Sequence, residues 1–497
     1  MKLLPIHIVF LFFVISASAQ PLKKPIELYT GPELNMSNNV RVPEIFGHDE
    51  NGYYAYSYDY REAIEFLDTK FRTVRRKHLD LLAGLRGRRL IGLSHFHDSI
   101  YMFTTEERMK RMLLFVETID KKTLIQNGDE RLLMDVSNLS GWGSDFGMHL
   151  SRQEEKLLVY SRLDVLSKNI QDVHLLLFGE GLSLEWEAKQ RIIYPARPPR
   201  RSIIKVSDEG DVFFISLLDD QNLGSLWQET KNRYHMIAVT ENSNYVNTYA
   251  LELPELYLRG VQIEPGVDHK LICAGFYSPT HYRSMVDGIF YFELDNRNGV
   301  FMNQRMFEFE PWFLREAIAE DPKKQPEELF DFRVRQLIRR NNGDFFMLAE
   351  NQYDQHYDTY QNIIAASFSP GGRLNWTRVV PKRQNIDPSV NFNYSSYSVH
   401  APWNTDKIYL IFNDSHKNEF LPPESRLKTF HPNDKSILRV ISLGTMGEMT
   451  GSIIYRKTKK RMKTPLPLQN YDMLTNEMII PLQRMKRYNY LKLTFNE

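Results

Sequence analysis

Apolar and polar positions alternate along most of the chain in short runs that are separated by tight turns. Residues 362–376 read NIIAASFSPGGRLNW, so apolar residues alternate with small or polar ones on both sides of the turn at 369–372. A period of two is typical of a strand with one buried face, and two such runs around a short turn predict a β-hairpin. Because an isolated hairpin is barely stable in water, this one must pack against other parts of the chain.

The hairpin belongs to a longer unit that recurs along the chain. Residues 334–382 read as strand, tight turn, strand, long gap, strand, tight turn, strand, and we name these strands a to d. The turns between strands a and b fall near residues 51, 98, 155, 209, 266, 343 and 405. An eighth unit begins at the turn 475–477 and holds only three strands, while PIELYT at 25–30 is a lone strand near the other terminus.

Four antiparallel strands per unit at about 50-residue spacing are typical of a β-propeller, in which each small sheet covers the apolar faces of its neighbours. We predict an all-β fold, a β-propeller of eight four-stranded blades, with seven blades as the alternative. The N-terminal strand is expected to join the C-terminal blade, which closes the ring and removes an open sheet edge. A β-solenoid or a pair of sandwiches would not explain the three-strand remainder. One domain is expected over 20–497, with a partly helical insertion at about 311–332 that covers one face as a lid.

Three segments carry a resemblance to a known group of proteins: NIIAASFSPGGRLNWTRVVPKRQ (362–384), DKIYLIFND (406–414) and NEMIIPLQRMKRYNYLKLTF (476–495). The chain resembles uncharacterised exported β-propeller proteins of Bacteroidetes-type bacteria. The likeness is strongest over roughly the last third and extends weakly to FGHDENGYYAYSYD near the start. It implies the propeller fold, export and ring closure. The family has no known activity, so it implies no site residue.

The first 19 residues have the pattern of a secretory signal peptide. Lys2 precedes an apolar run over 3–15, and ASA at 17–19 offers a small-residue cleavage site. The run is shorter than the roughly 20 residues that span a bilayer, so we expect export to the periplasm or the cell exterior without a membrane span after cleavage. Cys273 is the only cysteine, which excludes an internal disulfide. Its alternating context, HKLICAGFY, predicts a packed core thiol.

The connections between strands fall into two sets of different length. The a–b and c–d turns are tight, as in ENG, EGD, NNGD and SPGG, whereas the b–c and d–a connections are long. In a propeller blade the first set lies on one face of the ring, here named the turn face, and the second set lies on the opposite face, named the loop face. Long ordered loops on a rigid scaffold often carry function, which predicts a ligand site on the loop face.

Aromatic and polar side chains are dense in the loop-face connections. A rigid ring offers a large contact area and a neighbouring amide or carboxylate fixes orientation, so such loops suit a glycan or an extended peptide. The alternative is that these rings pack the loops against the blades. The candidate ligand-binding residues are Trp142, Trp227, His281, Tyr282, Arg283, Tyr353, His356, Tyr357, Asp358, Tyr360, Asn393, Tyr394 and His416.

No pattern nominates a catalytic residue, a metal site or a cofactor. His95 and His97 in HFHD lie at an a–b turn without a third ligand, and SGWGSDFG (140–147) lacks the strand–turn–helix setting of a nucleophile elbow. Asp414 and His416 would suit an acid–base couple, but polar turn chemistry explains them equally well. Neither a Gly-rich phosphate loop nor a zinc or EF-hand spacing occurs in the sequence.

The charge balance argues against one class of partner. The formal net charge is +1, with 63 basic and 62 acidic residues, and a neutral chain without a long basic run is not expected to bind nucleic acid. The short clusters RPPRRS and RKTKKRMK are attributed to solvated turns or edge protection.

The function expected from these patterns is that of an exported binding or scaffolding propeller. It would hold a glycan, a peptide or another envelope protein on its loop face. The alternative is a hydrolase or lyase that cleaves a polysaccharide or peptide on the same face. An enzyme should gather titratable side chains with perturbed pKa at the mouth of the central channel, whereas a binder should present aromatic and amide groups there.

Overall fold

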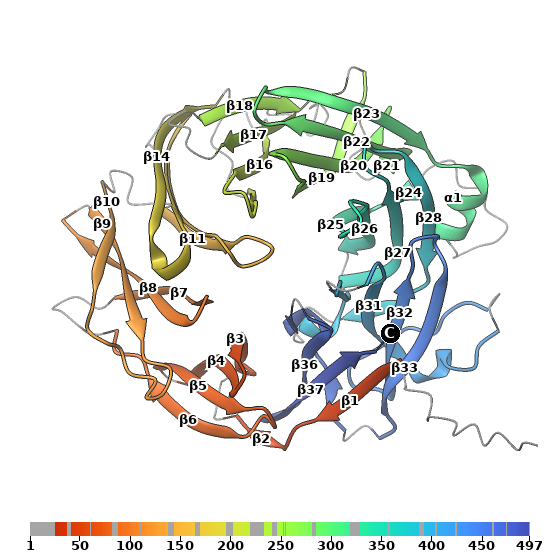
Figure 1. The fold of residues 1–497 in the computed structure, drawn as a ribbon. Helices are drawn as coiled ribbons and strands as arrows, with labels where there is room; N and C mark the ends of the chain where they lie inside the picture. Colours follow the sequence, from red (N-terminus) through yellow and green to blue (C-terminus); the bar gives the residue numbers. More distant parts are fainter. Residues whose placement is uncertain are drawn as a thin grey trace, which may run out of the picture.

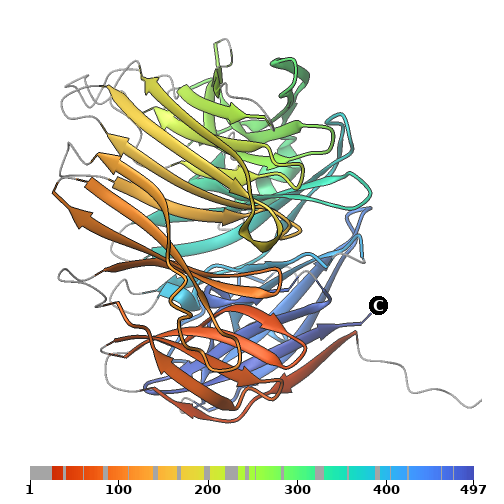
Figure 2. The ribbon, with the colours of Figure 1, turned by 60° about the vertical axis from the view of Figure 1, so that its left-hand side comes forward.

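Eight small sheets form a ring around a central axis in the computed structural model of the chain (Figure 1). The first strand of each blade lies nearest the axis and the last lies on the outside of the ring (Figure 1). Seen after a 60° rotation, the strands run between two opposite faces, where the turns collect (Figure 2). The chain is therefore a β-propeller of eight blades, as the repeat predicted. The structure describes residues 25–36, 41–59, 61–81, 88–109, 111–137, 144–164, 169–194, 202–218, 233–240, 246–251, 253, 255–280, 285–318, 329–354, 358–386, 392–402, 405–422, 425–459, 462–473 and 475–496.

The first four blades each contain four strands in chain order, paired antiparallel. Blade 1 is β3 (Glu44–Asp49), β4 (Gly52–Asp59), β5 (Arg61–Asp68) and β6 (Thr73–His78). Blade 2 is β7 (Arg89–Phe96), β8 (Ser99–Arg108), β9 (Arg111–Ile119) and β10 (Arg131–Ser137). Blade 3 is β11 (Ser144–Leu150), β12 (Leu157–Asp164), β13 (Ile170–Phe178) and β14 (Leu184–Ile193), with η1 (Glu180–Leu182) in its c–d turn. Blade 4 is β15 (Ile203–Val206), β16 (Val212–Leu218), β17 (Arg233–Val239) and β18 (Val246–Leu251).

The next three blades follow the same order with short additions. Blade 5 is β19 (Tyr257–Pro265), β20 (Lys270–Ser278), β22 (Gly288–Asp295) and β23 (Val300–Glu308). Blade 6 is β25 (Phe332–Arg339), β26 (Phe345–Asp354), β27 (Asp358–Phe368) and β28 (Leu374–Val380), and β29 (Gln384–Ile386) also pairs with β27. Blade 7 is β30 (Ser398–His400), β31 (Ile408–Ser415), β32 (Ser436–Leu443) and β33 (Met449–Lys457). The short elements between them are β21 (Met285–Val286), which pairs with β24 (Leu329–Phe330), and the turns η2 (Phe392–Tyr394) and η3 (His416–Asn418).

Blade 8 joins the two ends of the described chain. Its strands are β36 (Glu477–Arg484), β37 (Arg487–Phe495), β1 (Ile26–Thr30) with β2 (Leu34–Asn35), and an inner strand split into β34 (Thr464–Pro465) and β35 (Tyr471–Asp472) by η4 (Pro467–Gln469). β1 pairs antiparallel with β37, so that Ile26 lies opposite Phe495. The Nδ2 group of Asn489 also donates to the carbonyl oxygen of Gly31 at 2.8 Å. The predicted closure of the ring by the N-terminal strand is confirmed.

Eight hydrophobic clusters fill the eight seams between neighbouring blades. In the seam between blades 4 and 5, for example, Phe213 packs with Leu271, Cys273 and Phe290, each of them fully buried. The thiol of Cys273 is free, and burial raises its pKa, as expected for a core thiol rather than a reactive one. Because burying such a side chain stabilises by about 1.5–3 kcal/mol, the seams rather than the single sheets hold the ring together.

One helix, α1 (Pro311–Ile318), begins the connection between blades 5 and 6. Its residues Phe313, Leu314 and Ala317 are buried in the cluster that joins these blades. The Nδ2 group of Asn362 donates to the carbonyl oxygen of Ala317 at 2.8 Å. The helix lies on the outer side of the ring (Figure 1) and seals a seam. Residues 319–328 of the insertion predicted as a lid over one face lie outside the described residues.

Candidate functional site

Three neighbouring cavities form a row along the wall of the central channel. They are named the turn-face cavity, about 370 Å³, the middle cavity, about 350 Å³, and the loop-face cavity, about 320 Å³. Arg152, Lys205 and Glu264 line both the turn-face and the middle cavity. Arg335 and Gln336 line both the middle and the loop-face cavity. The row therefore extends from one face of the ring toward the other.

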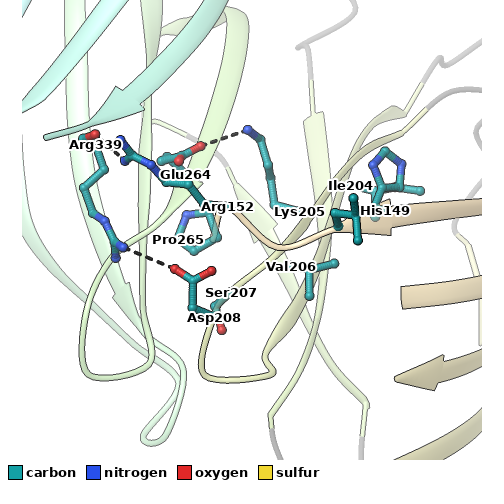
Figure 3. Close-up of a pocket in the computed structure, with 11 residues that line it drawn as sticks. His149, Arg152, Ile204, Lys205, Val206, Ser207, Asp208, Glu264, Pro265 and Arg339 are labelled. Carbon is teal, nitrogen blue, oxygen red and sulfur yellow. Dashed lines mark hydrogen bonds and ion pairs between the residues drawn. The ribbon is translucent and has the colours of Figure 1, made fainter. Parts of the chain in front are cut away.

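Paired charges line the turn-face cavity, where strands β11, β15, β19 and β25 end (Figure 3). The Nζ atom of Lys205 lies 2.8 Å from Glu264 Oε2, and Arg339 Nη2 lies 3.6 Å from Asp208 Oδ2. Arg152 donates from Nη1 to the carbonyl oxygen of Arg339. Burial lowers the pKa of Arg152; the carboxylate of Glu264 opposes the shift and the like charge of Arg339 adds to it. The cavity thus offers fixed donors and acceptors close together.

A carboxyl–imidazole pair stands at the middle cavity. Asp472, on β35, lines this cavity and keeps 41% of its side chain exposed. Its Oδ1 atom contacts Nδ1 of His400, whose buried ring stacks on Phe495 with centroids 4.4 Å apart. Burial raises the pKa of Asp472, and the neighbouring His400 and Arg152 partly offset this shift. A carboxyl group with a raised pKa holds its proton to a higher pH than an ordinary aspartate and is therefore better suited to donate it to a bound ligand.

A buried ion pair supports the wall of the loop-face cavity. The side chains of Glu350 and Lys382 are fully buried, with 2.7 Å between Lys382 Nζ and Glu350 Oε1. Arg335 Nη2 lies 3.1 Å from Glu350 Oε2, and the Ser396 hydroxyl donates to the same oxygen at 2.6 Å. Burial lowers the pKa of Lys382, while the carboxylate of Glu350 opposes this shift. The network holds the Arg335 guanidinium at the boundary between two cavities.

Two tyrosine rings, Tyr360 and Tyr397, complete the loop-face cavity. The Tyr360 ring lies 5.7 Å from Lys382 Nζ, a cation–π contact. The hydroxyl of Tyr397 is buried and has no hydrogen-bond partner in the described part of the chain. Burial raises the pKa of Tyr397 well above its ordinary value, and the negative charge of Glu350 adds to the shift. Apolar ring surface therefore lies beside the amide and guanidinium groups.

The structure places the candidate ligand-binding residues from the sequence in different environments. Tyr360 lines a cavity. Tyr394 packs against the seam between blades 8 and 1, where burial raises its pKa to about 12, and the neighbouring Asn393 is half-buried. The Nδ1 atom of His416 lies 3.0 Å from the carbonyl oxygen of Lys435 within the loop. Seven further candidates lie outside the described residues: Trp142, Trp227, His281, Tyr282, Arg283, His356 and Tyr357. For Tyr353 and Asp358 the structure describes the backbone but not the side chain.

Asp414 and His416, weighed as an acid–base couple, each contact other partners. Asp414 is buried, and it accepts hydrogen bonds from Asn418 Nδ2 at 2.6 Å and from Arg439 Nε at 3.0 Å. These contacts fix the b–c connection of blade 7. The interpretation as polar turn chemistry is the one that the contacts favour.

The charged lining of the channel was missed in the sequence. Arg335 and Gln336 stand between the buried Val334 and Leu337 and break the alternation of β25, while Lys205 and Glu264 lie within short apolar strands. The available signal was a charged or amide residue inside the first strand of a blade (strand a). This strand lies next to the channel, so such a residue indicates a polar channel wall. The turn-face cavity lies at the tight turns, where no site was expected.

Among the residues that the structure describes, one group of side chains could hold a metal ion. Glu209, Asp211 and His269 offer ligand atoms that all lie within 4.8 Å of one another. Glu209 already accepts hydrogen bonds from the backbone N–H groups of Asp268 at 3.0 Å and His269 at 2.8 Å, and Asp211 Oδ2 lies 2.9 Å from His269 Nδ1. These contacts clamp the a–b turns of blades 4 and 5 together, which explains the group without an ion.

Comparisons with known proteins give distant likenesses to solved structures and no family. No known family profile and no curated protein matches the chain. It is similar in fold to the WD40 domain of SCAP from fission yeast, with a TM-score of 0.43, 9% identity and 97% of each chain covered. It is also similar to the polysaccharide lyase Uly1, with a TM-score of 0.41, 8% identity, and 93% of this chain and 100% of that one covered. Prolyl oligopeptidase B from Galerina marginata has a TM-score of 0.38 and 9% identity, over 89% of this chain and 54% of that one.

The described residues contain one α-helix of eight residues, and no helix among them has the length and apolarity to cross a bilayer.

Proposed function

We propose that this protein is an exported binding propeller that holds an oligosaccharide in its central channel, with the loop face as the entrance. The observation that carries the proposal is the row of three cavities whose neighbours share lining residues. A row of small sites suits a chain of repeated units better than a single compact ligand. Export rests on the signal-peptide pattern of residues 1–19.

The charge balance of the wall favours a ligand rich in hydroxyl groups. Three of the four basic side chains, Lys205, Arg335 and Arg339, are paired with Glu264, Glu350 and Asp208. The fourth, Arg152, interacts with the charge of Glu264 as well. Such pairs present donors and acceptors at fixed positions with little net charge, which suits sugar hydroxyls. A polyanion would require an excess of cations, and an apolar ligand would leave these groups without partners.

The test is calorimetry with neutral and acidic oligosaccharides, using the chain without residues 1–19. Gln336→Ala, which removes an amide shared by two cavities, should weaken the binding of a retained oligosaccharide about twofold to tenfold, the range for one hydrogen bond. Gln190→Ala, at an exposed position on the outer strand β14, is the matched control and should bind normally. The proposal fails if no oligosaccharide binds, or if the two variants behave alike.

A second candidate, cleavage of the same ligand, is favoured by one observation. The middle cavity contains the carboxyl group of Asp472, whose pKa is raised by burial, next to Arg152 and Glu264. A carboxyl group with a raised pKa is suited to donate a proton to a leaving oxygen. If the chain is a hydrolase or lyase, Asp472→Asn should abolish the release of reducing ends and leave binding within about twofold of the wild type. Product formation by Asp472→Asn at the wild-type rate would exclude this role.

A further inference from the structure

A groove of about 740 Å³ lies on the outer side of blade 8, away from the channel. We name it the blade 8 groove. It is bounded by Thr30 of β1, by Tyr455 of the neighbouring β33, and by the hairpin turn at 484–487 between β36 and β37. The turn at 484–487 is a b–c connection, so the groove opens toward the loop face.

Positive charge dominates the blade 8 groove. Its four basic residues face one acidic residue, Glu33. The Glu33 carboxylate lies between two of them, with Oε2 2.8 Å from Lys463 Nζ and Oε1 2.9 Å from Arg487 Nη1. The other two, Arg484 and Lys486, form no ion pair within the described part of the chain. The groove therefore holds one carboxylate already and retains two cations for others.

The turn beside the groove exposes an apolar side chain in a strained conformation. Met485 is 79% exposed and has a φ of 53°. This left-handed conformation costs a residue with a side chain about 1–2 kcal/mol, and turns that need it usually contain Gly or Asn. Tyr455 and Met462, which are partly exposed, extend the apolar surface into the groove, above the buried Leu482. Met485 therefore offers an exposed apolar side chain next to the basic residues of the groove.

We infer that the blade 8 groove binds an acidic peptide segment of a partner protein. Arg484 and Lys486 pair with carboxylates of the segment, in the way that Lys463 and Arg487 hold Glu33, and Met485 contacts an apolar side chain between them. Within the groove itself, the basic residues already pair with a carboxylate, that of Glu33. A peptide fits better than an isolated acid because basic and apolar groups alternate along the groove.

The chain contains an internal control for this inference. The tetrapeptide RMKR occurs twice at b–c turns, at 484–487 in blade 8 and at 108–111 in blade 2. Met109 is also exposed, at 90%, with a φ of 45°. In blade 2, however, Arg108 pairs with Glu106 and Arg111 pairs with Asp135. The two turns share their sequence, but both arginines of the blade 2 turn are paired, whereas Arg484 of the blade 8 turn forms no ion pair within the described residues; Lys110 lies outside those residues.

The experiment measures fluorescence anisotropy of a short labelled peptide rich in glutamate with a central leucine, alongside the same peptide with glutamine in place of glutamate. The wild-type chain should bind the acidic peptide and ignore its glutamine counterpart. Arg484→Gln with Lys486→Gln should raise the Kd at least about tenfold, and Met485→Gly about threefold. The matched blade 2 changes, Arg108→Gln with Arg111→Gln and Met109→Gly, should leave the Kd unchanged.

Several results would overturn the inference. Absence of peptide binding, equal binding of the glutamine peptide, or equal losses from the two turns would each refute a groove specific to blade 8. Vesicles of phosphatidylglycerol supply the membrane alternative. If the wild type binds vesicles but not the peptide, and both RMKR turns contribute, the surface contacts lipid instead. Urea midpoints of the variants, expected at or above that of the wild type for Met485→Gly, separate lost binding from lost folding. Channel ligands do not enter this assay, so its outcome is independent of the oligosaccharide proposal.

Discussion

The buried Glu350–Lys382 pair should be much more important for stability than an exposed pair of similar geometry. Both side chains are fully buried and their charged atoms lie 2.7 Å apart. Removing one partner of a buried pair leaves an uncompensated charge and typically costs about 3–5 kcal/mol. Since Glu350 keeps Arg335 at 3.1 Å and Ser396 at 2.6 Å, Lys382→Met should fall at the low end, at about 3 kcal/mol.

The double variant Glu350→Met with Lys382→Met tests the cause. If the penalty comes from the lone charge, replacing both partners with apolar residues of similar volume should bring the free energy of unfolding back to within about 1 kcal/mol of the wild type. Lys189→Met is the control, because Lys189 and Glu187 form a pair at 2.6 Å with side chains 67% and 40% exposed. Such an exposed pair contributes less than about 1 kcal/mol.

The assay is urea unfolding at pH 7 followed by tryptophan fluorescence, with refolding checked for each variant. The expected order of stability is wild type and Lys189→Met together, then the double variant close below, then Lys382→Met well below. A Lys382→Met variant no weaker than Lys189→Met would refute the reasoning. A double variant as unstable as the single one would assign the loss to packing instead of charge.

Three further predictions concern the ring, a turn and pH. Deleting residues 25–30 should expose the outer edge of β37, lower the thermal midpoint and cause association visible by light scattering; deletion of residues 20–24 alone is the control, and identical behaviour of the two would contradict the closure. Gly372→Ala should lower the free energy of unfolding in urea by about 1–3 kcal/mol more than Gly371→Ala. Both glycines have a φ near 80°, but a Cβ atom at Gly372 would lie 2.1 Å from Tyr291 Cδ1, whereas a Cβ atom at Gly371 would lie 3.8 Å from its nearest neighbour. Burial raises the pKa of Asp472 above its ordinary value of 3.8, so the folded chain keeps this proton where the unfolded chain has released it, and this contribution to stability is lost as pH rises above about 4. Asp472→Asn should therefore gain stability relative to the wild type between pH 3 and pH 7, and parallel curves would argue against a raised pKa.

The fold could be predicted because its signals are local and repeated. The a–b turns expected near 51, 98, 155, 209, 266, 343, 405 and 475 lie between consecutive inner and second strands in every blade. Turn residues and alternation act within a few positions, so they are readable along the chain. The closing strand at 25–30 was deduced by counting strands, since β37 would otherwise have an open edge.

The candidate site was only partly predictable because its contacts join distant segments. Tyr360 was found since it stands in an aromatic loop, and it lines the loop-face cavity. Asp472 and His400 are 72 positions apart and meet only because blades 7 and 8 are neighbours. The break of the inner strand at η4, which precedes Asp472, has no signal beyond Pro465 and Pro467. Which side chains face the channel depends on the register of the first strand of each blade. A shift of this register by one residue exchanges the two faces of the strand, and the alternation pattern alone does not exclude such a shift.

The pairing of β1 with β37 also sets an order of events during folding. Ile26 emerges from the ribosome hundreds of residues before Phe495, its partner across the strand pair. Contacts of such large sequence separation form slowly. Strand β1 therefore remains solvent-exposed and unpaired until β37 has been synthesised. A chain whose synthesis stops before that point would form an open ring with two exposed blade surfaces. Such an intermediate is prone to aggregate, and we expect chaperones, more than the stability of any one sheet, to prevent this.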